Sequence, residues 1–129
     1  MEFPAGLTAS VELTVTAADT AESLGSGDVP VLATPRVVAL VEAATVAVVA
    51  AHLAEGQTSV GTRIELDHHA ASLVGATVVA EARLATVDGR ALGFEVVLRE
   101  GTTIAAQGRV ERVVVDRDRF LAKAAGRLT

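Results

Sequence analysis

The segment from Thr34 to Leu53 places apolar residues on nearly every face of a predicted helix. Helical spacing places Val37, Val41 and Val48 on one face of this helix, and further valines lie on the neighbouring faces. A helix that is apolar all round is buried rather than superficial. Because valine is a poor helix former, tertiary packing must hold this helix in place. The rest of the chain must therefore cover it.

Thr34-Pro35 marks where this helix begins. A threonine hydroxyl can cap the free amide groups of a first turn, and proline suits the first helical positions. The same hydroxyl would lie where amide groups and the helix dipole converge, which is a good position for holding a substrate carbonyl. We predict that Thr34 caps the helix, and a role in a binding site is compatible with capping.

Strand patterns fill most of the remaining chain. Alternation of apolar and polar residues predicts a first strand from Thr8 to Thr16. Four more strands are predicted after Gly56, with the ranges Val60 to His69, Gly75 to Val87, Leu92 to Arg99 and Ile104 to Val115. Asp88-Gly89 and Glu100-Gly101 are turn signals that join the last three strands as hairpins. A short helix from Asp116 to Ala124, capped by Asp116, is predicted to follow.

These elements predict an α+β fold. A five-stranded antiparallel sheet wrapped around one long central helix is the economical way to cover that helix. The 129 residues fit a single domain, residues 1–129. Only 2% of the residues are aromatic, so Val, Ala and Leu must build the core. Such small side chains leave surface that needs further cover, and a partner subunit is therefore plausible.

Charge and cysteine content exclude several classes of function. A net charge of -5 argues against general nucleic-acid binding, which requires a basic face. The absence of cysteine excludes disulfides, zinc–thiolate sites and a cysteine nucleophile, and a cytoplasmic location is expected. The first ten residues lack the basic region of a signal peptide, and the apolar run 37–51 is shorter than a membrane span. We therefore expect a soluble protein.

Glu42 is the single charged residue within the apolar run of the helix. Burying a carboxylate without a partner is costly, so a buried Glu42 would need a chemical reason. The alternative is that Glu42 lies on a narrow exposed stripe.

Asp67-His68-His69 ends a predicted strand, where alternation allows only one histidine to face the helix. Histidine is the natural acid or base near neutral pH, whereas this tripeptide alone is weak support for a metal site.

Two further features each have two interpretations. Gly61 either admits the close approach of a ligand or backbone, or marks a β-bulge. The C-terminal arginines, with Lys123, either form a solvated face or receive an anionic ligand such as the phosphates of a nucleotide carrier.

Five segments along the chain resemble the fluoroacetyl-CoA thioesterase group of the hot-dog superfamily. They are Val31-Leu32-Ala33-Thr34, Leu40-Val41-Glu42-Ala43-Ala44, Ser59-Val60-Gly61-Thr62, His68-His69-Ala70-Ala71 and Val110-Glu111-Arg112. The similarity extends from about Asp28 to Ala124. It implies a hot-dog fold and a homodimer with active sites at the subunit interface. It also implies hydrolysis of an acyl-CoA, or a related pantetheine thioester, with coenzyme A present only as part of the substrate and with no metal.

The resemblance further implies a set of site residues. The expected catalytic residues are Thr34, Glu42 and His68, and the expected substrate-binding residues are Gly61, Thr62 and Arg112. Glu42 is expected to act as a nucleophile or as a base for water, and His68 to exchange protons. Thr34 orients Glu42 or the acyl group, and amides near Gly61 bind the oxyanion.

One departure from the group limits the predicted substrate. The fluoroacetyl-specific member carries gating aromatic residues in the loop before the threonine, whereas the corresponding loop here, Gly25 to Leu32, has none. The resemblance therefore predicts general acyl-thioester hydrolysis rather than fluoroacetate resistance. Two rival functions are a hydratase or dehydratase, for which Asp67-His68 lacks the usual glycine-rich turn, and a non-catalytic dimer that binds an acyl carrier or apolar ligand.

Overall fold

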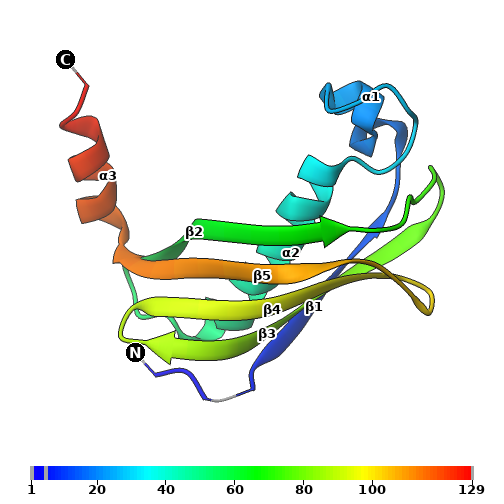
Figure 1. The fold of residues 1–129 in the computed structure, drawn as a ribbon. Helices are drawn as coiled ribbons and strands as arrows, with labels where there is room; N and C mark the ends of the chain where they lie inside the picture. The colour runs from blue at the N-terminus through cyan, green and yellow to red at the C-terminus, as the bar shows by residue number, and fades with distance from the viewer. Residues whose placement is uncertain (1, 5, 129) are drawn as a thin grey trace.

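A five-stranded antiparallel sheet curves around one long helix, as the sequence predicts (Figure 1). The computed structural model describes residues 2–4 and 6–128. The strands are β1 (Thr8–Thr14), β2 (Gln57–His68), β3 (Thr77–Asp88), β4 (Ala91–Glu100) and β5 (Thr103–Asp116), in the spatial order β1-β3-β4-β5-β2. The helices are α1 (Ala21–Leu24), α2 (Thr34–Val49) and α3 (Arg117–Ala125), with 3-10 turns at Ala17–Asp19 and Ala50–His52.

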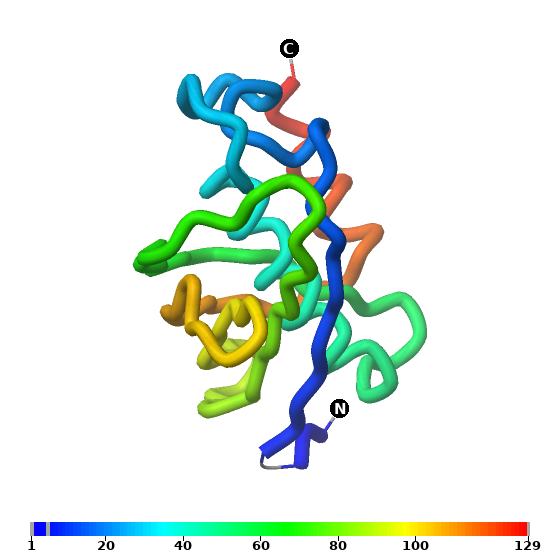
Figure 2. Tube along the Cα trace, turned by 90° about the vertical axis from the view of Figure 1, so that its right-hand side faces the viewer, coloured from blue at the N-terminus to red at the C-terminus, as the bar shows by residue number. Residues whose placement is uncertain are grey.

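The long helix α2 provides one side of the core. Its buried residues are Val37, Leu40, Val41, Ala44, Thr45, Val48 and Val49. They pack against inward-facing residues of the sheet, among which Phe94 on β4 is the largest fully buried side chain. In the side view, β1 (blue) runs alongside the helix (cyan) (Figure 2). By length and hydropathy the segment Thr34–His52 would suffice to cross a membrane, and 39% of its apolar window is buried inside the subunit. Its other face, which includes Ala39, Ala43, Val46 and Ala47, is exposed, so the predicted burial of the helix on nearly every face was wrong within one subunit.

Hairpins join β3 to β4 and β4 to β5 at the predicted turns. Gly89 and Gly101 have φ values of 60° and 59°, which lie in the left-handed region that favours glycine. The predicted α2 was too long at its C-terminal end, because the helix stops at Val49 and a 3-10 turn follows. The predicted loop from Ala17 to Pro30 contains two short helical turns that the composition did not reveal.

Asp19 ties one of these turns to the start of α2. Its carboxylate accepts hydrogen bonds from the backbone N–H and hydroxyl of Thr16 and from Nε of Arg36 at 2.9 Å. The bond from the Thr16 amide, followed by the contact with Arg36, lowers the pKa of Asp19. This buried carboxylate therefore fixes the loop against the first turn of α2, where Thr34 lies.

Strand β2 forms one edge of the sheet and is paired only with β5. Beyond it, α3 extends away from the sheet at one end, and α1 with the N-terminal turns of α2 rises at the other end (Figure 1). Asp116 precedes α3 as predicted, but its side chain makes no capping hydrogen bond. The outer edge of β2 thus presents backbone groups without strand partners between two projecting segments.

Candidate functional site

Thr34 and His68 are hydrogen-bonded to each other. The distance between Thr34 Oγ1 and His68 Nδ1 is 2.8 Å, and the tautomer of the ring decides which atom donates. The predicted cap was wrong, because Ala33 is the N-cap residue and Thr34 is the first residue of α2. The hydroxyl is therefore committed to the histidine rather than to the helix amides.

His68 lies against α2, whereas His69 is exposed. Burial lowers the pKa of His68 below its ordinary value of 6.5. Its Nε2 atom is buried and has no hydrogen-bond partner among the described residues. Because buried polar atoms normally have a partner, this unpaired nitrogen marks His68 as a candidate functional residue.

A β-bulge in β2 brings Gly61 and His68 onto the same face of the sheet. Gly61 pairs with Arg112 and Arg63 pairs with Glu111, so Thr62 is the extra residue. Seven positions separate Gly61 from His68, and strict alternation would place them on opposite faces. Because the bulge adds one residue to β2, the in–out alternation of side chains shifts by one position after Thr62. Gly61 and His68 therefore both face α2.

Glu42 on α2 forms an ion pair with Arg112 on β5. Nη1 of Arg112 donates to Oε2 of Glu42 at 3.0 Å. The side chain of Glu42 is 33% exposed and that of Arg112 is 7% exposed. Glu42 is therefore neither fully buried nor on a solvated stripe: one side is held by a buried cation and the other remains accessible.

Ser59 anchors Arg112 from the neighbouring strand. Nε of Arg112 donates to the Ser59 hydroxyl and Nη2 donates to the Ser59 carbonyl, both at 2.9 Å. Burial lowers the pKa of Arg112, while the contact with Glu42 opposes this change. No role for Ser59 was predicted from its residue type, although strand alternation places it on the same face as Gly61.

Gly61 leaves room for the carboxylate of Glu42. A Cβ atom at position 61 would lie 2.5 Å from Glu42 Oε2, which is closer than non-bonded atoms approach. The φ value of Gly61 is not positive, so a larger residue here would disturb the position of the Glu42 carboxylate rather than the backbone conformation. The sequence left two interpretations of Gly61: close approach of another group, or a β-bulge. In the structure a side chain, the Glu42 carboxylate, approaches Gly61 closely, and the bulge lies at the next residue, Thr62.

The site residues thus form two separate clusters within one subunit. One cluster contains Thr34 and His68, and the other contains Glu42, Gly61, Ser59 and Arg112. Thr34 and Glu42 are eight residues apart on α2, which corresponds to about 12 Å along the helix axis. No hydrogen bond joins the two clusters in the part of the chain that the structure describes.

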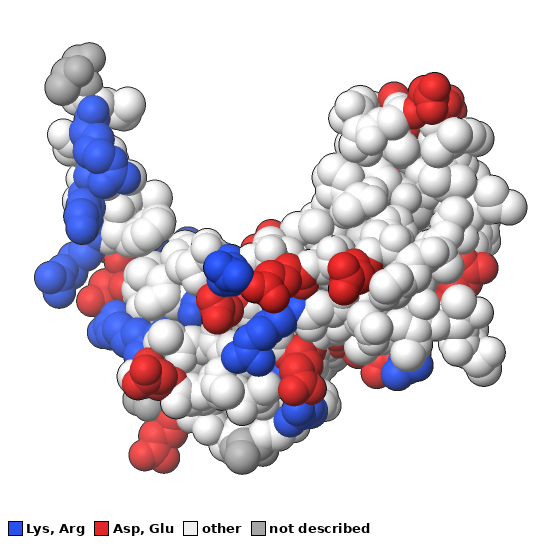
Figure 3. All heavy atoms as spheres, viewed as in Figure 1, with Lys and Arg blue, Asp and Glu red and all other residues white. Residues whose placement is uncertain are grey.

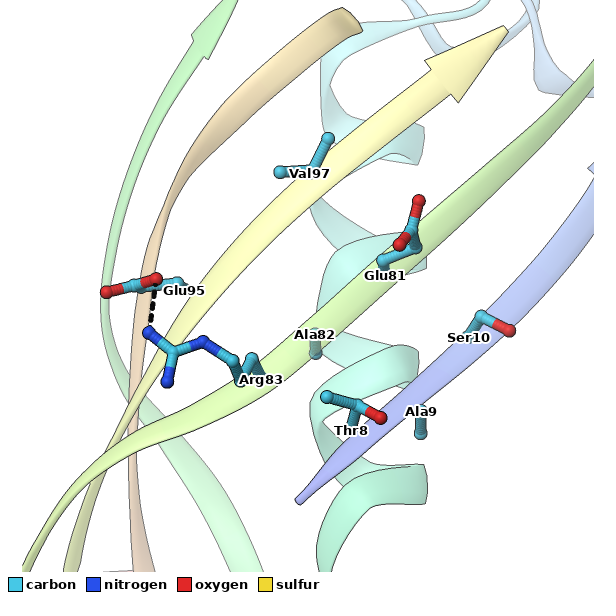
Figure 4. Close-up of a pocket in the computed structure, with 8 residues that line it drawn as sticks. All are labelled: Thr8, Ala9, Ser10, Glu81, Ala82, Arg83, Glu95 and Val97. Carbon is cyan, nitrogen blue, oxygen red and sulfur yellow. Dashed lines mark hydrogen bonds and ion pairs between the residues drawn. The ribbon is translucent and has the colours of Figure 1, made fainter. Parts of the chain in front are cut away.

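A hollow of about 320 Å³ opens beside the first cluster. It is lined by the loop before α2 and the segment after β2, including Asp28, Val29, Leu32, Thr34, His68 and Ala70. A different hollow lies over β1, β3 and β4, where Arg83 and Glu95 form an ion pair at 2.7 Å (Figure 4). It contains none of the predicted site residues. No group of three potential metal ligands occurs within residues 2–4 and 6–128.

Comparison with known sequences identifies similarity to fluoroacetyl-CoA thioesterases. The family model described as fluoroacetyl-CoA-specific thioesterase matches residues 15–118. The fluoroacetyl-CoA thioesterase of Streptantibioticus cattleyicolor is 39% identical over 93 residues, which cover 72% of this chain and 67% of that protein.

Solved structures show the same similarity over the whole fold. The fluoroacetyl-CoA thioesterase FlK superposes with a TM-score of 0.93 at 30% identity, covering 100% of both chains. A thioesterase superfamily member from Thermus thermophilus gives a TM-score of 0.88 at 28% identity, covering 96% of this chain and 92% of that one. A hot-dog-like protein from Thermanaerovibrio acidaminovorans, at 24% identity and a TM-score of 0.89, shares the fold over 98% of this chain and 94% of its own.

Proposed function

The chain belongs to the fluoroacetyl-CoA-specific thioesterase family, and on this basis we propose that it hydrolyses acyl-CoA thioesters at a site shared between two subunits. The products are a carboxylic acid and free coenzyme A, with no further cofactor. The observation that carries the proposal is the carboxylate of Glu42, which Arg112 holds over Gly61 while one side stays accessible.

The separation of the two clusters supports a homodimer. The unpaired edge of β2 can pair with the same edge of a second copy, and a two-fold axis makes this pairing antiparallel. An axis midway between Gly61 and His68 would place His68 of the partner subunit opposite Gly61. Each site would then combine Glu42, Gly61 and Arg112 of one subunit with Thr34 and His68 of the other.

Glu42 is the residue that attacks in this proposal. Its carboxylate either adds to the thioester carbonyl carbon directly or removes a proton from the water molecule that adds. In both routes a C–O bond forms, the C–S bond breaks, and the sulfur leaves as a thiolate that takes up a proton. In the direct route the product is a mixed anhydride of Glu42, which water then cleaves to release the carboxylic acid and restore the carboxylate. Arg112 fixes the orientation of the carboxylate, and amides near Gly61 and Thr62 stabilise the oxyanion.

His68 handles the proton in this proposal. Thr34 holds Nδ1, which leaves the buried Nε2 without a partner among the described residues and available for proton transfer once the site is assembled. Because burial lowers its pKa, His68 is neutral at pH 7 and can both accept and donate a proton. The neutral imidazole first accepts a proton from water, and the imidazolium formed in this way donates it to the leaving sulfur.

The hollow beside Thr34 and His68 is proposed to receive the acyl group. Its apolar lining includes Val29, Val31 and Leu32, and no aromatic residue contributes. Such a lining accepts small apolar acyl groups without a requirement for fluorine. A cytoplasmic location, where coenzyme A thioesters are made and used, fits this substrate.

A panel of acyl-CoA thioesters tests the proposed function. Free thiol is measured with a thiol reagent, and we expect many equivalents of thiol per subunit from at least one short acyl-CoA. Release of no more than one equivalent would instead indicate a binding protein. Addition of water to an enoyl-CoA without thiol release would indicate a hydratase.

The lowered pKa of His68 predicts the pH dependence of hydrolysis. A neutral imidazole is required, and protonation occurs only once the pH falls through the lowered pKa. The acid limb of the kcat/KM profile is therefore expected below pH 6.5, the ordinary pKa of histidine. The profile is measured from about pH 4.5 to about pH 8.5, roughly two units on either side of that pKa. An acid limb at or above pH 6.5 would contradict the proposed state of His68.

A further inference from the structure

The C-terminal segment differs in charge from the rest of the protein. Residues 117–129 carry four of the eleven Lys and Arg residues but only one of the sixteen Asp and Glu residues. The chain as a whole has a net charge of -5. Figure 3 shows these basic side chains gathered on the projecting helix α3. A local positive potential on an acidic protein attracts an anion selectively.

A hollow of about 610 Å³ lies at the base of α3, and we name it the basic groove. Its lining residues are Arg90, Val114, Val115, Asp116, Arg119, Phe120 and Lys123. Three of these residues are cations and one is a carboxylate. Phe120 adds an aromatic surface that is 42% exposed. The groove therefore combines positive charge with a face on which a planar ring can stack.

The cations of the basic groove are only loosely engaged. Arg90 and Arg119 each approach Asp116 to 3.7 Å, which is longer than a hydrogen bond. Arg90 also makes one long bond of 3.4 Å to the carbonyl of Val114. Among the described residues, no hydrogen bond holds the side chains of Arg119 and Lys123. Most of their donors are therefore free to bind phosphate oxygens.

The basic groove lies close to the proposed catalytic carboxylate. Asp116 pairs with Gln57 and Arg112 pairs with Gly61, so the same two strands carry both positions. Four residues of β5 separate them, which corresponds to about 13 Å. A flexible pantetheine arm can bridge such a distance between a thioester carbon near Gly61 and a nucleotide near α3.

We infer that the basic groove binds the phosphorylated nucleotide of the coenzyme A substrate. Arg119, Lys123 and Arg90 contact the phosphate groups, and Phe120 packs against the adenine ring. This inference rests on the proposed function and adds to it the residues that bind the nucleotide of the carrier. A nucleotide site favours coenzyme A over a carrier protein, because a protein-bound pantetheine has no adenine to place there.

The double variant Arg119→Ala/Lys123→Ala tests the basic groove. Its kinetics are compared for two substrates with the same acyl group: the acyl-CoA and the truncated N-acetylcysteamine thioester, which lacks the nucleotide. We expect KM for the acyl-CoA to rise at least about tenfold, because tenfold is roughly the effect of losing one charged hydrogen bond and two cations are removed. The kcat/KM for the truncated thioester should stay unchanged, and light scattering should give the same mass as the wild type.

The matched control is Arg83→Ala/Arg99→Ala, which removes two exposed cations from the outer face of the sheet. It should leave KM for the acyl-CoA unchanged. Equal KM values for the wild type and the Arg119→Ala/Lys123→Ala variant would overturn the inference. A loss of the dimer in that variant would also overturn it, because the cations would then serve subunit contact.

Calorimetry separates failure of this inference from failure of the proposed function. Coenzyme A itself is titrated into the wild type and into the Arg119→Ala/Lys123→Ala variant, where no turnover is needed. About tenfold weaker binding in the variant supports the basic groove even if the wild type hydrolyses neither thioester. Equal binding by both proteins contradicts the groove even if both hydrolyse acyl-CoA.

Discussion

Glu42→Gln is expected to lower kcat for acyl-CoA hydrolysis by roughly 10³-fold or more, because an amide is neither a nucleophile nor a base. The substitution preserves the shape of the side chain, and the amide oxygen can still accept the bond from Arg112. Arg112 also keeps its two bonds to Ser59. The variant should therefore fold and bind substrate while losing turnover.

Thiol release measures this loss, and thermal unfolding checks that the fold is retained. The control is Glu81→Gln, which removes the charge of an exposed glutamate that pairs with Arg99 on the outer face. The control should retain wild-type kcat. If Glu42→Gln, correctly folded, kept more than about a tenth of the wild-type kcat, Glu42 would not be the attacking group.

Mixing two inactive variants is expected to restore activity. In the proposed dimer, Glu42 of one subunit works with His68 of the other. A mixed dimer of Glu42→Gln and His68→Ala subunits therefore contains one site with both substitutions and one intact site. Random exchange makes half of the dimers mixed, so about a quarter of the wild-type activity should return.

This experiment requires subunit exchange, which brief exposure to a moderate urea concentration followed by dilution provides. Each variant is treated alone in the same way as the control, and each should remain inactive. If Glu42 and His68 acted within one subunit, the mixed dimer would contain no intact site and no activity would return. A monomer by light scattering would equally contradict the shared site.

Much of the fold could be predicted from local sequence patterns. The apolar helix, the alternating strands and the turns at Gly89 and Gly101 depend on neighbours close in sequence. The boundaries shifted, as when α2 ended at Val49 rather than at Leu53, and the two short helical turns between Ala17 and Leu24 were not predicted. Helix ends and short turns such as Ala17–Asp19 depend on single side-chain bonds, which composition does not reveal.

The candidate site was less predictable from residue patterns. The pattern Thr34-Pro35 predicts a helix cap, yet the Thr34 hydroxyl bonds to His68, which is 34 positions away. Ser59 received no role, because its importance lies in two bonds to Arg112 from a paired strand. Local patterns describe an element but not which side chains meet across two elements.

By itself the sequence determined that one apolar helix must be covered by an antiparallel sheet, since hydrophobic periodicity is a local property. The order of its motifs also identified the family resemblance. Only the tertiary structure decided that Thr62 forms a bulge, that Gly61 and His68 share a face, and that Glu42 rests against Arg112. These facts depend on strand register and on space between packed elements, which no single segment encodes.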